Sequence, residues 1–224
     1  MNLYEWQEID GRLSLYFPKE KESVFLDWQS DYFYHLRQKY SLRQEPLAKA
    51  LGLKGDRATF VWDLTCGTGK DTLLMLAFGC KLLAFERNPV IFRLLANAHL
   101  FLEAPLKERF HLFEGDVRMF DFKNIPVPDV LYLDPMYEQA QKKRKALPRK
   151  EMRLFRLIAG DDLDAKELLS WALSYAQEKK ISRVVVKRSL KLPPLLDGVT
   201  NSYEGKSTAY DLYRVITSQV VQNS

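Results

Sequence analysis

Short apolar runs alternate with amphipathic segments through the middle of the chain, and this order constrains the fold most. Runs rich in Val, Leu and Phe occupy residues 60–64, 81–86, 110–114, 129–133 and 183–187. Helical periodicity occupies residues 71–78, 89–102 and 163–177 between them. Apolar strands with little alternation are typical of a parallel sheet that helices cover on both faces. We therefore expect an open α/β sheet.

The residues before this alternating region follow a less regular pattern. Residues 12–17 alternate as a strand does, and the aromatic-rich residues 24–40 are expected to be mostly helical. Pro46 and Gly52 enclose a short helix, because proline favours the start of a helix and glycine its end. The chain is therefore expected to divide into two parts. These are an N-terminal accessory region, residues 1–55, and a main domain, residues 56–224.

Composition gives a few bounds on the kind of protein. The 224 residues are 46% hydrophobic and carry a formal charge of +5, which permits a polyanionic partner without establishing one. The N-terminus is acidic, aromatic and interrupted by Pro18, so we expect no signal peptide, and no apolar run reaches membrane-spanning length. Cys66 and Cys80 offer neither a disulfide framework nor a metal-ligand spacing. A cytoplasmic protein is expected, with no membrane partner and no metal.

A glycine-containing turn, Cys66-Gly-Thr-Gly-Lys-Asp71, follows the first strand of the expected sheet. Gly67 and Gly69 would allow the backbone to approach a ligand and to adopt unusual dihedral angles. Lys70 and Asp71 would open the next helix, with Asp71 suited to capping it. Two glycines at such a junction are a weak signal alone, because an ordinary strand–helix turn has the same composition.

Acidic residues at the ends of three successive strands strengthen this signal. Asp63 precedes the turn, Glu86 lies 17 residues after Gly69, and Asp116 follows the third strand. A carboxylate about 20 residues beyond the glycines can accept hydrogen bonds from both hydroxyls of a ribose. Asp63 could bind the ammonium of a methionine moiety, and Asp116 an adenine amino group, with Val117 packed on the ring. Together they predict a site for S-adenosylmethionine.

The fourth strand ends in Asp134-Pro135-Met136-Tyr137, which suits an amine substrate. The exocyclic amine of a purine is a poor nucleophile, because its lone pair is delocalised into the ring. Asp134 and the Pro135 carbonyl could accept its two hydrogens, while Tyr137 could stack on the extruded base. Direct in-line transfer of a methyl group would then need no metal. The alternative is a tight Asp-Pro turn without a catalytic role.

Basic residues cluster after this element. Residues 142–156 contain eight basic residues and one acid, which fits contact with a phosphate backbone better than a solvated loop. The end of the fifth strand could also meet substrate phosphate, although strand-end solvation is an equal alternative. The candidate RNA-binding residues are Lys142, Lys143, Arg144, Lys145, Arg149, Lys150, Lys187 and Arg188.

The chain ends in two β-prone runs, residues 198–203 and 209–216, with Gly205 and Lys206 between them. They predict a terminal antiparallel hairpin that closes the sheet. This ending is typical of class I (Rossmann-like) methyltransferases. It is unusual for nicotinamide-dependent oxidoreductases, whose glycine turn also has a third spaced glycine.

A series of longer motifs carries a family resemblance over most of the chain. They are Ala48–Lys54, Cys66–Asp71, Phe85–Pro89, Tyr132–Tyr137, Lys150–Arg153, Gly160–Asp164, Val184–Arg188 and Tyr210–Tyr213. In order and spacing they resemble the bacterial small-subunit ribosomal RNA guanine methyltransferases of the J type. The resemblance implies methylation of the exocyclic amine of a guanosine near the 3′ end of 16S rRNA. It also implies that Lys70, Asp71, Glu86, Arg87, Asp116, Val117 and Asp134 contact S-adenosylmethionine.

Two further functions stay open at the level of sequence. Asp-Pro-x-aromatic elements also serve other amines, so a methyltransferase acting on DNA adenine or on a protein is possible. A non-catalytic RNA-binding or assembly factor could keep the same fold. The intact acids at three strand ends argue against this second function.

Overall fold

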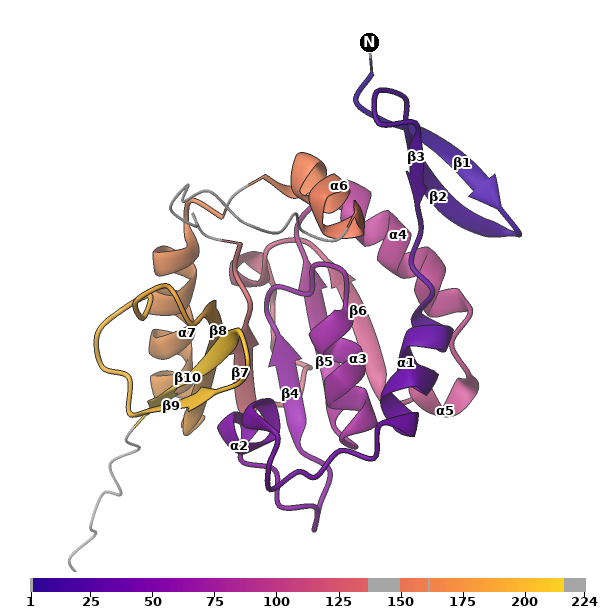
Figure 1. Ribbon diagram of the computed structural model, residues 1–224. Coiled ribbons are helices and arrows are strands. Elements are labelled where there is room, and N and C mark those ends of the chain that lie inside the picture. The colour runs from indigo at the N-terminus through magenta and orange to yellow at the C-terminus, as the bar shows by residue number, and fades with distance from the viewer. Residues whose placement is uncertain (1, 137–149, 161, 216–224) are drawn as a thin grey trace, which may run out of the picture.

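The computed structural model describes residues 2–136, 150–160 and 162–215 (Figure 1). Its centre is a seven-stranded sheet with the strand order β6-β5-β4-β7-β8-β10-β9. The strands are β4 (Phe60–Asp63), β5 (Lys81–Glu86), β6 (Phe110–Glu114), β7 (Val130–Leu133), β8 (Arg183–Ser189), β9 (Asn201–Glu204) and β10 (Thr208–Arg214). The first five are parallel, and β10 is antiparallel to both β8 and β9. The predicted α/β sheet with a terminal hairpin is confirmed.

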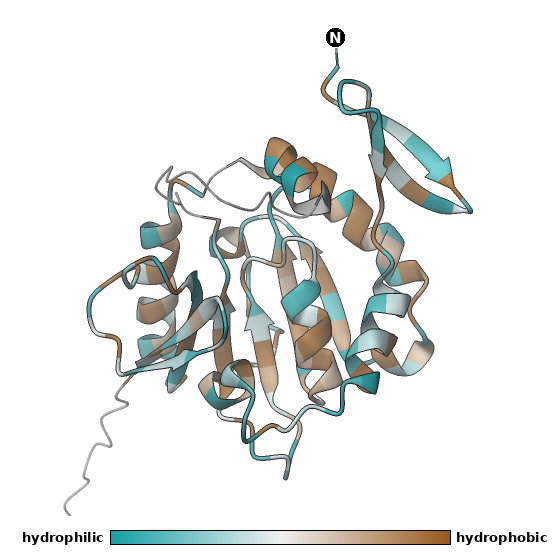
Figure 2. Cartoon of the chain, in the orientation of Figure 1, coloured by the Kyte–Doolittle hydropathy of each residue, from teal (hydrophilic) through white to brown (hydrophobic). Residues whose placement is uncertain are grey.

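Helices cover both faces of the sheet, as the near-continuous apolar strands require. One buried cluster joins the sheet to α3 (Lys70–Ala77) and α4 (Pro89–Leu100), and a second joins it to α7 (Ala165–Lys179). The apolar colouring accordingly follows the strands and the inward faces of the helices (Figure 2). The short α5 (Ala104–Lys107) and the 3-10 turn η1 (Val117–Met119) flank β6. The three helices predicted here are confirmed, with ends that differ by one or two residues.

The N-terminal residues form a small antiparallel sheet followed by two helices. The sheet contains β1 (Glu5–Ile9), β2 (Arg12–Phe17) and β3 (Glu22–Val24), of which only β2 was predicted. The expected helix over residues 24–40 is shorter and forms α1 (Trp28–Arg37). Val24 instead pairs with Leu15 in the sheet, and the Asp27 carboxylate caps the helix by accepting the N–H of Ser30.

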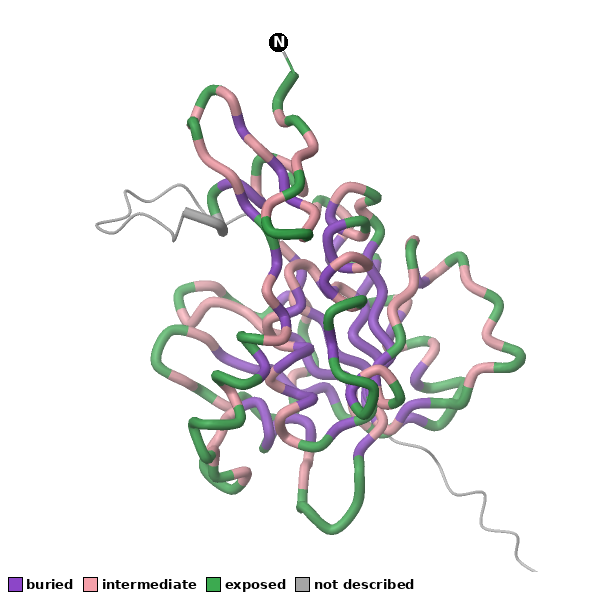
Figure 3. The backbone as a smooth tube through the Cα atoms, turned by 90° about the vertical axis from the view of Figure 1, so that its right-hand side faces the viewer, coloured by how far each residue is buried: buried purple, intermediate pink, exposed green. Residues whose placement is uncertain are grey.

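The second N-terminal helix, α2 (Pro46–Leu51), is confirmed between its proline and its left-handed C-cap Gly52. Both α1 and α2 contribute buried side chains to the main core, including Trp28, Leu47 and Leu51. The small sheet lies against α4, where the Leu13 N–H donates to Asn97 Oδ1 at 3.0 Å. The N-terminal region therefore shares its interior with the main domain. Buried stretches occur in the small N-terminal sheet as well as in the centre of the molecule (Figure 3).

Helix α6 (Lys150–Ala159) was not predicted. It occupies the second part of the basic segment, for which the sequence allowed either an RNA contact or a solvated loop. Residues 142–149 of that segment lie outside the described part. Leu154 and Phe155 are buried, and the side-chain amide of Asn88 donates to the Ile158 carbonyl at 3.1 Å. These contacts place α6 beside α4, above the carboxyl ends of the central strands (Figure 1). Leu154, Phe155 and Ile158 are spaced as on one face of a helix, but the segment was interpreted by its basic charge.

Candidate active site

One cavity lies at the carboxyl ends of β4, β5, β6 and β7, where parallel α/β sheets bind their ligands. All predicted cofactor residues except Gly69 line it: Asp63, Gly67, Lys70, Asp71, Glu86, Arg87, Asp116, Val117 and Asp134. Lys187 from β8 and Phe155 from α6 complete its wall. The tertiary structure therefore brings together acids that are far apart in the sequence.

The glycine turn is held from outside by the N-terminal helix. Gly67 and Gly69 have φ angles of +57° and +77°, which side-chain-bearing residues rarely adopt. The indole N–H of Trp28 donates to the Thr68 carbonyl at 3.0 Å, and its ring packs against Gly69. No sequence pattern tied Trp28 to this turn, because the contact spans 40 residues. Gly69 is the N-cap of α3, so the expectation that Asp71 caps the helix is wrong.

Glu86 is fixed by the backbone on both sides. Its Oε2 accepts the N–H of Gly67 at 2.9 Å, and its Oε1 accepts the N–H of Asn88 at 2.7 Å. Burial raises the pKa of Glu86 to about 7, although these two hydrogen bonds oppose the shift. Each carboxylate oxygen has a second lone pair, so the group can still accept from a ligand.

Asp63 is the most deeply buried acid of the site, with 1% of the residue exposed. The Thr72 hydroxyl donates to Oδ2 at 2.6 Å, and the Thr65 N–H donates to Oδ1 at 3.2 Å. Burial raises the pKa of Asp63 to about 7, against the effect of both hydrogen bonds. A cationic group in the cavity would stabilise its ionised form.

Asp134 stands at the edge of the cavity and is held at two points. Its backbone N–H donates to Thr65 Oγ1 at 2.6 Å, and its Oδ2 accepts from Lys187 Nζ at 2.9 Å. The same ammonium lies 2.7 Å from Asp71 Oδ2, which also accepts the Tyr132 hydroxyl. Lys187 therefore bridges two carboxylates, which was not expected from its position at a strand end.

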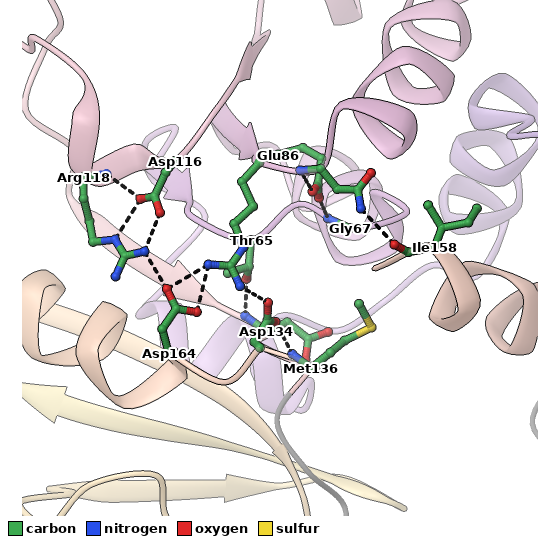
Figure 4. A network of polar contacts seen from close by, with 12 residues as sticks. Thr65, Gly67, Glu86, Asp116, Arg118, Asp134, Met136, Ile158 and Asp164 are labelled. Atoms are coloured by element: carbon green, nitrogen blue, oxygen red, sulfur yellow. Dashed lines mark hydrogen bonds and ion pairs between the residues drawn. The ribbon is translucent and has the colours of Figure 1, made fainter. Parts of the chain in front are cut away.

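An ion-pair network forms the rim of the cavity and joins β5, β6 and the start of α7 (Figure 4). The Arg87 guanidinium contacts Asp162 at 2.5 Å and Asp164 at 2.8 Å. Arg118 joins Asp164, at 2.5 Å, to Asp116. These contacts hold the loop before α7 over the predicted adenine-binding residues. The two aspartates of that loop had no predicted role.

The same network reaches the backbone of the Asp134–Met136 segment. Asp162 Oδ2 accepts the Met136 N–H at 2.5 Å, and the Met136 carbonyl accepts the Asp162 N–H at 2.9 Å. The backbone on the C-terminal side of Pro135 is therefore tied to the loop that binds Arg87. Tyr137 lies outside the described residues.

Among the other candidate RNA-binding residues, Arg188 is bonded within the protein, and the side chains of the rest lie outside the described part. Arg188 donates to Asp211 Oδ2 at 2.6 Å and to the Leu192 carbonyl at 2.9 Å, so its guanidinium is engaged within the C-terminal part of the sheet. Lys150 is the first residue of α6, and its side chain is outside the described part, as are Lys142, Lys143, Arg144, Lys145 and Arg149.

The described part of the chain contains neither a candidate metal cluster nor a helix that could span a membrane. No three His, Cys, Asp or Glu side chains of that part come together as a metal site would require. None of its helices is both long enough and apolar enough to cross a bilayer.

Comparison with known proteins gives consistent matches. The family model described as "Putative SAM-dependent methyltransferase" matches residues 5–215. "Ribosomal RNA small subunit methyltransferase J" of Thioalkalivibrio sulfidiphilus is 39% identical over 217 residues, which cover 92% of this chain and 82% of that protein. The protein of the same name from Salmonella paratyphi B is 38% identical over 197 residues, covering 85% and 76%. The crystal structure of a SAM-dependent methyltransferase from Neisseria gonorrhoeae has a TM-score of 0.66 and 25% identity, covering 93% and 81%.

The fold and the cavity are those of a class I methyltransferase that depends on S-adenosylmethionine. Within that class, the chain belongs to the ribosomal RNA small subunit methyltransferase J family. The resemblance seen in the sequence is confirmed, and a nicotinamide-dependent oxidoreductase is set aside. The acids at the strand ends therefore line a cavity in a methyltransferase fold.

Proposed function

We propose that this enzyme methylates the exocyclic N2 amine of a guanosine near the 3′ end of 16S rRNA, as naked RNA or within the small ribosomal subunit, in the cytoplasm. The observation that carries the amine chemistry is the placement of Asp134. Its side chain is 40% exposed at the edge of the cavity and is held by Thr65 and Lys187. The names of the relatives support ribosomal RNA as the substrate.

The cavity fits S-adenosylmethionine by the chemistry of its donors and acceptors. Buried Asp63 offers a carboxylate to an ammonium, and Glu86 retains lone pairs for the hydroxyls of a ribose. Asp116 and Val117 also line the cavity, and a carboxylate and an apolar side chain suit the amino group and the ring of an adenine. The bound cofactor supplies an electrophilic methyl group on a sulfonium. The residues that we assign to binding the cofactor are Asp63, Gly67, Gly69, Lys70, Asp71, Glu86, Arg87, Asp116, Val117 and Asp134.

Asp134 and Pro135 are assigned to orient the substrate amine. The Asp134 carboxylate and the Pro135 carbonyl each accept one hydrogen of the amine, which localises the nitrogen lone pair. Tyr137 stacks on the extruded guanine. The hydrogen bonds to Thr65 and Asp162 fix the backbone on both sides of Pro135, so the two acceptors keep one relative position.

The test is methyl transfer from labelled S-adenosylmethionine to naked 16S rRNA and to small subunits, both lacking the modification. Nucleoside mass spectrometry should detect guanosine methylated on its exocyclic amine. The better of the two substrates shows when in assembly the enzyme acts. Asp134→Ala should lose transfer while keeping the fold and the melting temperature of the parent. Retained turnover in that variant would remove Asp134 from its assigned role.

Other outcomes point to the remaining functions. Cofactor binding without transfer to either RNA would favour another amine, on DNA adenine or on a protein. Failure to bind S-adenosylmethionine would favour a non-catalytic RNA-binding or assembly factor. Mass spectrometry of the labelled product distinguishes methylated adenine from a methylated protein side chain.

RNA docking is proposed for the basic segment and for the N-terminal accessory region, residues 1–55. Lys142, Lys143, Arg144, Lys145, Arg149 and Lys150 would contact phosphates and supply salt-dependent affinity. Support for a nearby docking surface comes from α6, which continues this segment and lies over the cavity. Arg153 of α6 contacts Glu22 of the small sheet at 3.4 Å, so these two elements are neighbours.

A further inference from the structure

We propose that Lys187 is a positioning residue for methyl transfer, which holds the Asp134 carboxylate in place and keeps it ionised. The inference rests on the proposed role of Asp134 as the acceptor for the substrate amine. It replaces the expectation that Lys187 meets a substrate phosphate. Lys187 itself is not required to touch the substrate or the methyl group.

The geometry shows how the ammonium is shared. Lys187 Nζ lies 2.9 Å from Asp134 Oδ2 and 2.7 Å from Asp71 Oδ2. Asp71 is in turn fixed by the hydroxyl of Tyr132, whose ring is completely buried in β7. The Lys187 side chain is only 21% exposed, and it projects from β8 at the position paired with Tyr210 in β10. The ammonium is therefore held by a carboxylate of helix α3 and by Asp134, which directly follows β7.

The charges around Asp134 explain why a cation is needed there. Asp63 from β4, Asp71 from α3, Tyr132 from β7, Tyr210 from β10 and Asp162 from the loop before α7 surround the pair of Asp134 and Lys187. The confined setting raises the pKa of Asp134, and Asp71 and Asp162 act in the same direction. The Lys187 ammonium opposes them. Without it, the pKa of Asp134 would rise further, and its carboxylate would be less available as an anionic acceptor for a hydrogen of the amine.

The contacts also argue against a phosphate-binding role. An ammonium already shared by two carboxylates would have to leave both in order to reach RNA, and each would then lose a charge-assisted hydrogen bond. If Lys187 contacted a phosphate, its removal should weaken RNA binding and reduce the dependence of affinity on salt. A positioning role instead predicts a change in kcat and in its dependence on pH.

The experiment compares Lys187→Gln and Lys187→Arg with the parent in methyl transfer to the ribosomal substrate between pH 5.5 and 9. In Lys187→Gln the acidic limb of the kcat profile should move up by at least about one pH unit, which reduces kcat about tenfold or more at pH values on that limb. KM for the RNA should change less than about threefold. Lys187→Arg keeps the cation, so its acidic limb should stay where the parent has it, even where kcat falls.

The matched control is Lys191→Gln, at an exposed position in the turn after β8. It removes one lysine near the same strand end and should leave the pH profile unchanged. An unmoved acidic limb in Lys187→Gln would overturn the inference, as would a raised KM with a smaller salt slope. A moved limb in Lys187→Arg would overturn it even if Lys187→Gln fails to fold. An inactive parent enzyme would instead contradict the proposed function, so the two failures are distinguishable.

Discussion

The indole of Trp28 lies directly against Gly69, so the N-terminal helix α1 supports the glycine turn of the cofactor site. A Cβ built on Gly69 would come within 2.7 Å of Trp28 Cε2, closer than real Cβ atoms approach. The same ring donates to the Thr68 carbonyl and packs on Phe110 of β6 at a centroid distance of 5.3 Å. Part of the N-terminal region therefore packs against the glycine turn, whose neighbouring residues line the cavity.

Gly69→Ala should destabilise the protein and weaken binding of S-adenosylmethionine. The new methyl group would meet both a left-handed backbone, which costs about 1–2 kcal/mol, and the Trp28 ring, where overpacking costs about 1–3 kcal/mol more. Gly11→Ala is the matched control, because Gly11 has φ +74° but open space around it. Urea denaturation should show a larger loss of stability for Gly69→Ala than for Gly11→Ala. Calorimetric titration should show a loss of cofactor affinity only for Gly69→Ala. Equal effects of the two substitutions would refute the contribution of Trp28.

Glu86→Gln should change how stability depends on pH. The pKa of Glu86 is about 7 in the folded state and about 4.5 ordinarily, so between these values the folded state holds a proton that the unfolded state releases. This group therefore makes the free energy of unfolding fall as pH rises through that window, by as much as about 3 kcal/mol. The Glu86→Gln variant should lack this contribution to the decrease in the free energy of unfolding. Urea denaturation at pH 4.5, 6 and 8 measures it.

The control for that titration is Glu114→Gln, which alters an exposed position of the neighbouring strand β6. Its pH profile should follow that of the parent protein. A Glu86→Gln profile parallel to the parent would mean that folding does not change the pKa of Glu86.

Asp162→Ala should slow methyl transfer by about tenfold or more. The substitution removes a hydrogen bond to the Met136 N–H and an ion pair with Arg87, and hydrogen bonds to charged groups contribute about 1.5–3 kcal/mol. Single-turnover kinetics with saturating cofactor measure the effect. Asp121→Ala removes the exposed pair with Lys123 and should stay within about twofold, since such pairs contribute little. Similar rates for both variants would show that the rim network does not position the Asp134–Met136 segment.

Replacing Lys142, Lys143, Arg144 and Lys145 together with Gln should weaken RNA binding at low salt. Each lost phosphate contact should lower the slope of log affinity against log salt by about 0.7 for single-stranded RNA. Filter binding from 50 to 300 mM salt, with kcat measured at saturating RNA, separates affinity from chemistry. An unchanged slope together with unchanged affinity would place the RNA elsewhere on the surface. Lys191→Gln again serves as the control for loss of a surface lysine.

Local patterns were sufficient for most of the sheet and for the acids of the site. The five parallel strands were predicted from apolar runs, and the carboxyl ends of parallel strands share one edge. Asp63, Glu86 and Asp116 therefore had to meet at that edge, and the cavity lies there. The helix α6 was missed because its segment was interpreted by its basic charge, although the buried Leu154 and Phe155 belong to a helical pattern. The contact of Trp28 with the glycine turn had no local signal at all.

The sequence by itself determined the strand order along the chain, the glycine turn and the family, because these depend on residue type and short-range spacing. Only the tertiary structure decided the partner of each charge. Lys187 reaches Asp71 across 116 residues, and Arg87 reaches Asp164 across 77. Such pairs depend on which strands are neighbours and on which face each side chain leaves its strand. For that reason a lysine that resembles a phosphate ligand in the sequence lies in the structure between two carboxylates.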